Sequence, residues 1–429
     1  MRIFLTGAGG FIGRHISAAL LADGHALYAM VRPGKEAGVV MGAAAVAGDM
    51  AHDLTVEAWL PRLQGVDVVI NCAGILREQG SSTFLAVHEL APQALYRACV
   101  QAGVKKVVQI SALGEPEGNA FIASKYRGDD VLLTLPIASV VLRPSVIYSV
   151  NGSYGGTSML RGLAALPGIL LLPGQGGQLI QPLAAEDLVR LVRAAVCSPA
   201  GDGRILYAGG PEAMSLRDYL LAWRQWLAGR AAYEVRLPLG LVRLGVRIGE
   251  VLAPGPFNRT IISMLEQGNH LRAGQINAAD IYGLPVQPLR AALGARASYV
   301  QDRWHARLYF LKPLSVALAG IVWIISAVAG VYAPTATIAQ YAAGLGIPLA
   351  AAQGLDWFGS AVDAVLGLAL LCNYKVRQVL CLMLLSVLAY SAVFSVFMPG
   401  LWLEPMGGLL KNLLVLPSLF FLLLTEDAA

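Results

Sequence analysis

The chain has 429 residues, enough for two or three domains, and 56% of them are hydrophobic while only 14% are charged. This composition excludes an ordinary soluble protein. Residues 311–429 hold four Lys or Arg and five Asp or Glu, against 28 and 22 in residues 1–310, so the apolar excess lies in the C-terminal part. The net charge is +5 and the basic residues are scattered singly, so we expect no nucleic-acid partner.

Neither a metal site nor a disulfide framework is predicted. The five cysteines form no CxxC pair and no His/Cys cluster of metal-binding spacing. We therefore expect reduced thiols in a cytosolic or membrane setting. Arg2 and the apolar residues after it are soon interrupted by glycines, which favours a first strand over a signal peptide.

A glycine-rich stretch at residues 6–13 follows this strand and precedes an amphipathic run at residues 15–21. Glycines at the first, fourth and seventh positions after Thr6 allow a tight turn, close approach of a pyrophosphate and tight packing of helix on strand. The alternative is a glycine-rich turn without a ligand. We assign to a dinucleotide site the residues Gly7, Gly10, Phe11, Ile12 and Gly13.

Short apolar runs alternate with helical patterns through the first 200 residues. Strands separated by helices predict right-handed crossovers and a doubly wound parallel sheet, an α/β Rossmann fold. The predicted strands are Ile3–Leu5, Ala26–Val31, Ala44–Ala47, Val66–Cys72, Val104–Ile110 and Ala138–Leu142, with a helical pattern at Phe84–Ala102.

The end of the second strand bears on the choice of cofactor. No acidic residue stands about twenty residues after the glycines, where it would bind a ribose 2′-hydroxyl. Arg32, supported by Lys35, instead offers positive charge to a 2′-phosphate, which favours NADP over NAD. The alternative is two solvated cations in a loop.

Two more segments are predicted at the carboxyl ends of strands, the edge where open sheets bind ligands. Gly48-Asp49-Met50 follows the third strand, and Asn71-Cys72-Ala73-Gly74 follows the fourth. An aspartate and small residues at this edge suit an adenine and a closely placed ribose. We assign Asp49, Met50, Ala73 and Gly74 to the cofactor site.

Together with residues 109–114, Ser124-Lys125 and Leu142-Arg143-Pro144-Ser145, these motifs resemble the short-chain dehydrogenase/reductase superfamily. The resemblance is to its extended and atypical branch, which holds NAD(P)-dependent epimerases and dehydratases and the nucleotide-binding accessory subunit of respiratory complex I. It covers about residues 1–300 and is strongest before Tyr148. It implies a nicotinamide cofactor that also contacts Pro144.

The resemblance further implies a catalytic pair. Ser111 matches the serine that polarises the substrate, and Lys125 matches the lysine that binds the nicotinamide ribose and lowers the pKa of a tyrosine. That tyrosine belongs four residues before the lysine, where this chain has Phe121, which cannot deliver a proton. Tyr126 lies about 100° round the predicted helix from Lys125, on another face, and is the less favoured alternative for the acid. The alternative for Ser111 and Lys125 is a strand-end hydroxyl and an exposed helix cation.

Beyond Tyr148 the pattern is less regular. Residues 180–188 resemble the segment that closes over substrate in extended members, and we expect Asp187 to cap a helix over Leu188–Cys197. A strand at Ile205–Ala208 and a helix at Leu216–Leu227 are expected to form a small α/β substrate lobe. The run Leu239–Leu252 predicts an amphipathic helix that lies on a bilayer or packs into a core.

The C-terminal part predicts an all-α domain of four transmembrane helices. The spans are Pro313–Ala333, Leu355–Cys372, Val376–Met398 and Met406–Leu424. Basic residues precede the first span and separate the second from the third, so both sides are predicted cytoplasmic. We expect a multi-pass protein of the cytoplasmic (inner) membrane whose nucleotide-binding domain faces the cytoplasm.

Residues 401–412 resemble the loop and last helix of the DoxX-like family of small four-helix membrane proteins. Asp363 and Lys411 are ionisable groups inside predicted spans, a costly placement. We place both within two turns of the external ends, where they form an ion pair or a ligand-binding site.

The expected domains are a Rossmann domain at 1–200, a substrate or lid lobe at 201–308 and a membrane domain at 309–425. The leading hypothesis is a membrane-anchored NADP(H)-dependent oxidoreductase or epimerase that acts on a small, lipid-soluble or membrane-delivered substrate. A second is a non-catalytic NADP(H)-binding structural or sensory protein, favoured by Phe121. A third treats the membrane domain as a carrier or docking bundle that the head regulates.

Overall fold

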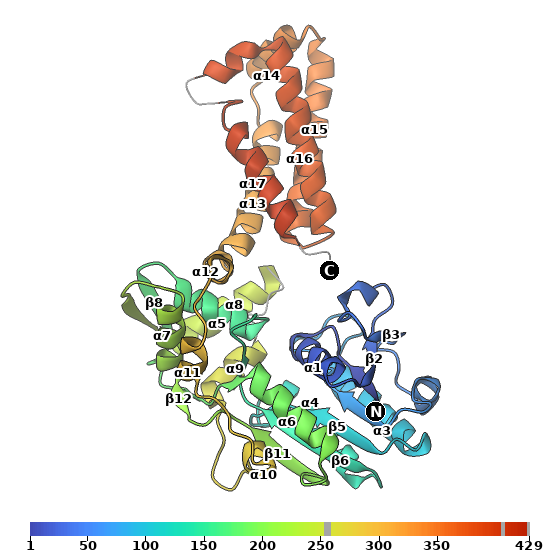
Figure 1. Ribbon diagram of the computed structural model, residues 1–429. Coiled ribbons are helices and arrows are strands. Elements are labelled where there is room, and N and C mark those ends of the chain that lie inside the picture. Colours follow the sequence, from blue (N-terminus) through green and yellow to red (C-terminus); the bar gives the residue numbers. More distant parts are fainter. Residues whose placement is uncertain (253–258, 405–407, 427–429) are drawn as a thin grey trace. The chain divides into compact units, whose positions relative to one another are not determined.

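The computed structural model describes residues 1–252, 259–404 and 408–426 and divides the chain into two compact units (Figure 1). The first comprises Met1–Arg247 and Pro256–Ala306, and the second Ile248–Gly255 and Arg307–Ala429.

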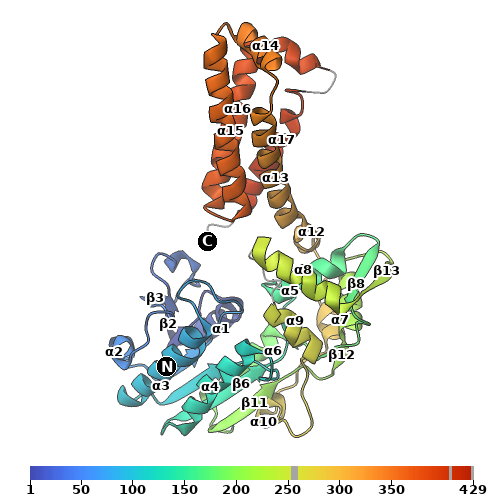
Figure 2. The ribbon, with the colours of Figure 1, turned by 180° about the vertical axis from the view of Figure 1, so that it is seen from behind.

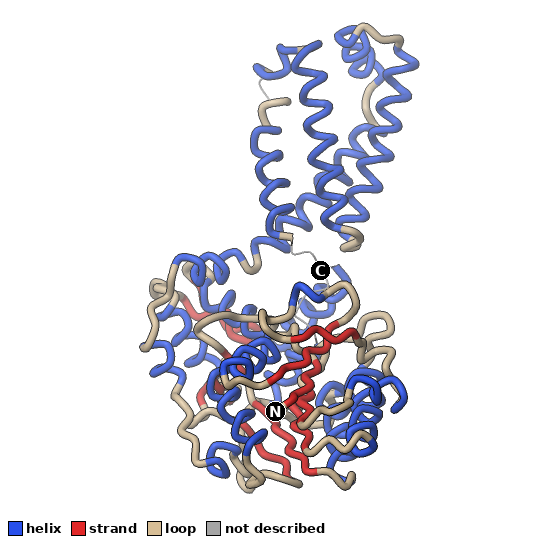
Figure 3. The backbone as a smooth tube through the Cα atoms, turned by 45° about the vertical axis from the view of Figure 1, so that its right-hand side comes forward, coloured by secondary structure: helices blue, strands red, loops and turns tan. Residues whose placement is uncertain are grey.

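The first unit is built on a seven-stranded sheet in which every neighbouring pair is parallel. Figure 3 shows these strands in red, side by side. This confirms the predicted doubly wound sheet. The strand order is β11-β6-β5-β4-β1-β2-β3, and it reverses beside β1. The bounds are β1 Arg2–Thr6, β2 Ala26–Val31, β3 Ala44–Ala47, β4 Val68–Asn71, β5 Lys106–Ile110, β6 Ala138–Pro144 and β11 Arg204–Ala208.

Helices cover both faces of this sheet because the strands between them are buried and apolar (Figures 1 and 2). One face carries α1 (Phe11–Ala22) and α6 (Ala185–Cys197). The other carries α2 (Val56–Trp59), α3 (Ala91–Gln101) and α4 (Ala120–Thr134). Ile16 and Leu20 of α1 share one side of the helix and are 1% exposed, which fixes that helix on the sheet.

Smaller elements pack beside the sheet. Parallel β8 (Ile169–Pro173) and β13 (Tyr233–Leu237) pair with each other, as do antiparallel β9 (Leu179–Ile180) and β12 (Met214–Ser215). The remaining elements are β7 Ile147–Tyr148, β10 Leu183–Ala184, α5 Gly156–Ala165, α7 Leu216–Trp226, α8 Leu239–Leu252, α9 Arg259–Gln267, α10 Ala278–Tyr282, α11 Leu289–Gly294 and α12 Val300–Leu308. Short helical segments of other types are η1 Glu36–Gly38, η2 Leu60–Arg62 and η3 Leu85–Leu90.

Two predictions in this region are wrong in detail. The strand expected in the substrate lobe is β11, which pairs with β6 at the edge of the main sheet. Asp187 lies inside the first turn of α6, whose N-cap is Ala184, and its Oδ2 accepts the Gln287 backbone N–H at 2.7 Å. A carboxylate expected to cap its own helix therefore holds a distant loop.

The two faces of helix α8 differ in exposure, as expected for an amphipathic helix. Val242 and Val246 are 9% and 1% exposed, so one face packs into the first unit. Leu241 and Leu244 are 59% and 52% exposed on another face.

Among the described residues of the second unit, three helices are long and apolar enough to cross a membrane: α13 (Leu311–Val331), α15 (Leu349–Leu371) and α16 (Val376–Phe397). The fourth predicted span is too long. Its described part, α17 (Asn412–Thr425), has 14 residues, and the predicted start at Met406 lies outside the described residues. Two unpredicted elements complete the unit, α14 (Thr335–Leu345) and η4 (Pro399–Leu403).

The helices α13 and α15 cross closely because glycines face each other. A Cβ on Gly367 would lie 2.9 Å from the Gly320 carbonyl oxygen, which leaves no room for a side chain. Asp363 accepts a hydrogen bond from the Ser326 hydroxyl at 2.7 Å, and the described residues show no ion pair with Lys411. α15 begins at Leu349, six residues before the predicted start, so Asp363 lies deeper than predicted.

Candidate functional site

The turn between β1 and α1 is shaped by its glycines. Gly7 has a φ of +66°, and a Cβ on it would lie 2.7 Å from the Cys72 carbonyl. A Cβ on Gly13 would lie 2.2 Å from the Gly7 carbonyl oxygen. α1 begins after Gly10 without a side-chain cap, so its first amides have no side-chain acceptor and suit an anion.

This turn adjoins the predicted lysine through the loop after β4. Gly7 packs on the backbone of residues 72 and 73, and the Lys125 ammonium donates to the Ala73 carbonyl at 2.7 Å. A Cβ on Gly74 would lie 3.0 Å from Lys125 Nζ. Residues from three parts of the chain thus meet at the carboxyl ends of β1, β4 and β5, where the strand order reverses.

Lys125 is only 4% exposed, and this burial lowers its pKa to about 8 because a charged ammonium loses hydration. Asp129 and Cys72 act in the opposite direction. The alternative of an exposed helix cation is therefore wrong for Lys125. A buried amine that titrates near neutral pH can both hold and release a proton.

The Ser111 hydroxyl is engaged in a buried network. It donates to Asp129 Oδ2 at 2.7 Å, and the same oxygen accepts Arg143 Nε at 3.1 Å and Nη2 at 3.0 Å. Asp129 is fully buried and Arg143 is 5% exposed. Burial raises the pKa of Asp129, while the guanidinium and the hydroxyl oppose this shift. The network fixes Ser111 beside Ile110, whose carbonyl lies 3.5 Å from Lys125 Nζ.

Phe121 occupies an aromatic cluster. Its ring centroid lies 6.1 Å from that of Phe84 and 5.4 Å from that of His88. His88 accepts the Ile75 N–H through Nε2 and bonds Ser124 through Nδ1, so both ring nitrogens are occupied. Burial and the Lys125 charge lower the pKa of His88 to about 2, which keeps the ring neutral.

Tyr126 also has its hydroxyl engaged. It donates to the Gly114 carbonyl at 2.8 Å, and the Arg143 guanidinium lies 3.3 Å from its ring centroid. Burial raises the pKa of Tyr126, which opposes its use as an acid at neutral pH. Neither Phe121 nor Tyr126 offers a ready proton.

The other predicted residues lie at the ends of the strands beside β1. Arg32 is exposed after β2, and the Gly48 N–H after β3 donates to the Val31 carbonyl at 3.0 Å, which holds the two ends together. Asp49 Oδ1 accepts the Ala51 N–H at 2.9 Å. Met50, Ala73 and Pro144 are buried, whereas Gly74 is exposed.

Sequence reasoning missed two charged groups beside the glycine turn and in the loop after β2. Arg14 Nε donates to the Gly9 carbonyl at 3.1 Å, which holds this cation against the glycine turn. The Glu36 carboxylate accepts the Gly34 N–H at 2.9 Å, and hydrogen bonds from the backbone N–H of Glu36 itself and from that of Gly34 lower its pKa. The glycine cradle, the uncapped helix and the buried lysine fit a nicotinamide dinucleotide, which Gly7, Gly10, Gly13 and Lys125 would hold.

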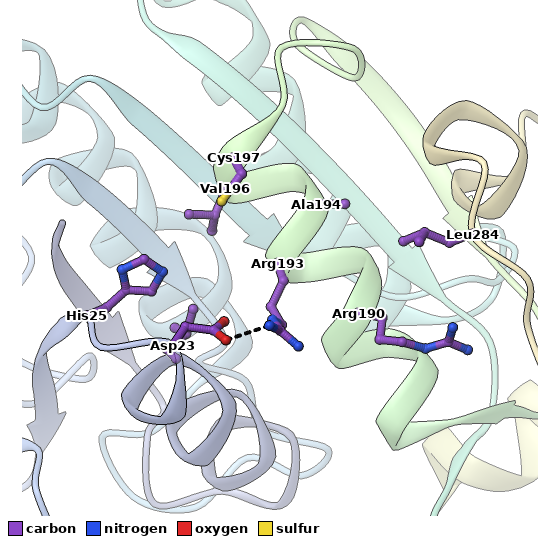
Figure 4. Close-up of a pocket in the computed structure, with 9 residues that line it drawn as sticks. Asp23, His25, Arg190, Arg193, Ala194, Val196, Cys197 and Leu284 are labelled. Atoms are coloured by element: carbon purple, nitrogen blue, oxygen red, sulfur yellow. Dashed lines mark hydrogen bonds and ion pairs between the residues drawn. The ribbon is translucent and has the colours of Figure 1, made fainter.

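A surface groove of about 500 Å³ lies elsewhere (Figure 4). It is lined by Asp23 and His25 at the far end of α1, about 18 Å from the glycine turn at 1.5 Å per residue. Its Arg193 pairs with Asp23 and its Arg190 with Asp187, so both cations are neutralised. The groove is therefore distinct from the predicted dinucleotide site.

Two family models match this chain. Residues 7–147 match the NAD(P)H-binding family, and residues 320–420 match the DoxX-like family. They confirm the predicted fusion of a nicotinamide-binding Rossmann domain with a DoxX-like domain of membrane-associated character.

Among curated proteins, a ceramide reductase of Caulobacter vibrioides is 30% identical over 156 residues, which is 34% of this chain and 46% of that protein. A 4-hydroxy-2-methyl-3-oxo-4-farnesyl-3,4-dihydroquinoline-1-oxide ketoreductase of Stigmatella aurantiaca is 28% identical over 114 residues, 26% of this chain and 33% of that protein. The chain thus spans less than half the length of these relatives.

Solved structures show the same fold. MoeE5 in complex with UDP-glucose and NAD aligns with a TM-score of 0.53 and 20% identity, covering 72% of this chain and 99% of its own. A nucleoside-diphosphate-sugar epimerase of Staphylococcus aureus aligns with a TM-score of 0.54 and 18% identity, covering 68% and 99%.

Proposed function

We propose that this protein is a membrane-anchored, NADPH-dependent oxidoreductase that reduces a carbonyl group of a lipid-soluble substrate, with Lys125 as the proton source. The observation that carries the proposal is the buried Lys125 ammonium beside the glycine turn, with a pKa lowered to about 8. Both curated relatives described above are named as reductases, and the printed names of their substrates describe a ceramide and a farnesyl compound.

Lys125 is suited to proton delivery because a general acid works best when its pKa lies near the operating pH. When bound, NADPH would supply a hydride to the carbonyl carbon. The carbonyl oxygen then needs one proton, which Lys125 Nζ provides in place of the phenol that Phe121 lacks. Ala73 and Ile110 carbonyls orient the ammonium at 2.7 and 3.5 Å, so its remaining N–H can face the substrate.

A preference for NADPH is supported by positive charge around the second strand. Arg32 and Lys35 are exposed there, and Arg14 lies against the glycine turn. The nearby Glu36 carboxylate is engaged by the Gly34 N–H, which weakens it as a partner for a ribose hydroxyl. A charge-assisted contact is worth about 1.5–3 kcal/mol, so Arg32→Glu should weaken NADPH binding roughly ten- to hundredfold and leave NADH binding less affected.

We also propose that the nucleotide-binding unit faces the cytoplasm from the inner membrane. Cations flank one end of the candidate spans, before α13 and between α15 and α16, which favours the cytoplasmic side for that end. They are Arg303, Arg307, Lys312, Lys375 and Arg377. A cytoplasmic site would have direct access to reduced cofactor.

The test is NADPH oxidation by the full chain in lipid nanodiscs, with farnesal and menadione as trial carbonyl compounds. We expect the rate to fall as the pH rises through 8, because Lys125 then loses its proton. Lys125→Met should lower the rate by about 100-fold or more. Oxidation that is unaffected by Lys125→Met would refute the role of this lysine.

A second candidate is a non-catalytic NADP(H)-binding protein. It is favoured by Phe121 and by the Ser111 hydroxyl, which is occupied by Asp129. Calorimetric binding of NADPH without turnover of either compound would favour it. Turnover created by Phe121→Tyr would show that the pocket is otherwise competent, whereas no gain would support the binding role.

A further inference from the structure

The helical bundle of the second unit has a well-packed apolar core towards the start of α16 and the end of α17. Buried and partly buried apolar residues from α13, α15, α16 and α17 meet there, including Trp323, Leu370, Leu380, Met383 and Leu422. On α16 the core runs from Val376 to Val387, and on α17 from Val415 to Leu423. Past these positions, towards the end of α16 and the start of α17, polar side chains replace the apolar ones.

These polar side chains form what we call the bundle cluster, with members on all four helices: Ser326, Asp363, Tyr390, Ser391 and Asn412. Asn412 joins two of its helices, since its Oδ1 accepts the Tyr390 hydroxyl at 3.2 Å and its Nδ2 donates to Ser391 Oγ at 2.8 Å. Asp363 accepts from Ser326 Oγ at 2.7 Å. Because α15 packs against both α13 and α16, and α16 packs against α17, the two halves of the cluster lie on neighbouring helices of one bundle.

The cluster lies at hydrocarbon depth. Tyr390 stands 14 residues after the start of α16, about 21 Å along the helix, and Asp363 stands eight residues before the end of α15, about 12 Å along it. Both distances fall within a hydrocarbon core of about 30 Å. Polar groups at this depth are costly unless they are paired.

The cluster is incompletely paired and incompletely buried. Asn412 is 7% exposed, but Tyr390 is 41% exposed and Asp363 is partly exposed. In the described part of the chain, neither a cation nor a second hydrogen-bond donor contacts the Asp363 carboxyl group. The cluster thus has spare acceptor capacity at Asp363 and at the Tyr390 oxygen, and spare donors at the Ser391 hydroxyl and the second N–H of Asn412.

We propose that the bundle cluster is a binding site for the hydroxyl head of a lipid-soluble alcohol, whose hydrocarbon tail lies among the apolar side chains of the bundle. A hydroxyl group donates to Asp363 or Tyr390 and accepts from Ser391 or Asn412. Its single oxygen therefore supplies both the donor and the acceptor that the cluster lacks. A molecule that carries only carbonyl oxygens cannot donate to the Asp363 carboxylate. A hydrocarbon satisfies neither requirement, and phosphatidylcholine has no hydroxyl to donate.

The site is independent of the nicotinamide chemistry proposed above, so its test needs no cofactor. The full chain is placed in phosphatidylcholine nanodiscs and exposed to a hexadecanol analogue with a diazirine and an alkyne in its tail. The matched probe has the same tail and no hydroxyl. We expect the alcohol to label α16 and α17 at least fivefold more than the hydrocarbon, and unlabelled hexadecanol to compete.

Tyr390→Phe removes only one hydroxyl and should lower labelling by the alcohol probe at least threefold, and Asp363→Leu should lower it further. Ser418→Ala is the matched control, because the Ser418 hydroxyl bonds the Leu414 carbonyl of its own helix, away from the cluster. Size-exclusion elution identifies any variant that has lost its fold, and Tyr390→Phe keeps the test decisive if Asp363→Leu is lost. Equal labelling by the two probes, or labelling unchanged in Tyr390→Phe, would overturn the proposal.

Discussion

Asp129→Asn tests the buried network that fixes Ser111. The substitution keeps the shape of the side chain and removes its charge. Asp129 is fully buried and receives the Ser111 hydroxyl and two N–H groups of Arg143. Arg143 is 5% exposed and has its guanidinium stacked on Tyr126, so it cannot reach water when the carboxylate is lost.

Breaking a buried ion pair by removing one partner costs about 3–5 kcal/mol, because the other charge stays buried without compensation. The amide oxygen of the substituted side chain retains one acceptor for the guanidinium, so we expect the lower end, about 3 kcal/mol. At roughly 2–4 °C per kcal/mol for a large domain, the melting temperature of the first unit should fall by about 6–12 °C. Intrinsic tryptophan fluorescence of the full chain in detergent follows this transition, since Trp59 is buried in the sheet core.

Asp130→Asn is the matched control, because Asp130 is the next residue on α4 and is exposed. It removes the same charge from the same helix and should change stability by less than about 0.5 kcal/mol. Asp129→Asn with Arg143→Met removes both charges, and it should recover part of the loss. If Asp129→Asn melts within about 2 °C of Asp130→Asn, less than the shift expected from the lost pair, the reasoning about this network is refuted.

Three further predictions concern the turn, the bundle and the lysine. Gly13→Ala places a methyl group against the backbone of the glycine turn. It should lower the free energy of unfolding by about 1–3 kcal/mol and weaken NADPH binding in calorimetry. A Cβ on Gly9 meets no atom within 4 Å, so Gly9→Ala should leave the melting temperature unchanged. In the bundle, Gly367→Ala should likewise lower the melting temperature, because its methyl group meets the backbone of α13. Gly359→Ala on the same helix meets open space and should leave the melting temperature unchanged. Equal effects of the two substitutions would contradict the close crossing of α13 and α15. Burial lowers the pKa of Lys125 from 10.5 to about 8. Between pH 8 and pH 10.5, Lys125 is therefore protonated in the unfolded chain and mostly deprotonated in the folded chain. Wild-type stability should therefore rise by about 3 kcal/mol relative to Lys125→Met from roughly pH 7 to 10.5 in denaturant titrations, and parallel pH profiles would argue against the shift.

The sheet was predictable because its signal is local. Short apolar runs separated by helical patterns specify strands buried on both faces, and the run at 26–31 coincides with β2. The pairing of β11 with β6 was not predictable in this way, since no local pattern says whether a short strand joins the main sheet or a separate lobe. The fourth span was overestimated for a related reason: hydropathy locates an apolar segment and does not fix where its helix begins.

The site was predictable where spacing carries the information and not where long-range contacts do. The distance from Phe121 to Lys125 places both on one side of α4, and the same spacing of four residues would have brought Asp129 into the prediction. What spacing leaves out is Arg143, which comes from β6 and decides how Ser111 is bonded. The predicted partner of Asp363 failed likewise, because the register of α13 against α15 selects Ser326.

The absence of a tyrosine at residue 121 changes what Lys125 has to do. Where a phenol is present, a lysine four residues later need only stay charged to lower the pKa of that phenol. In this chain the same position holds a phenyl ring that packs on Phe84 and His88, and His88 stays neutral with both nitrogens engaged. The amine is then the group of this cluster whose pKa lies near neutral pH. Burial thus has a chemical consequence: the desolvation that makes the Lys125 charge costly also makes its proton transferable.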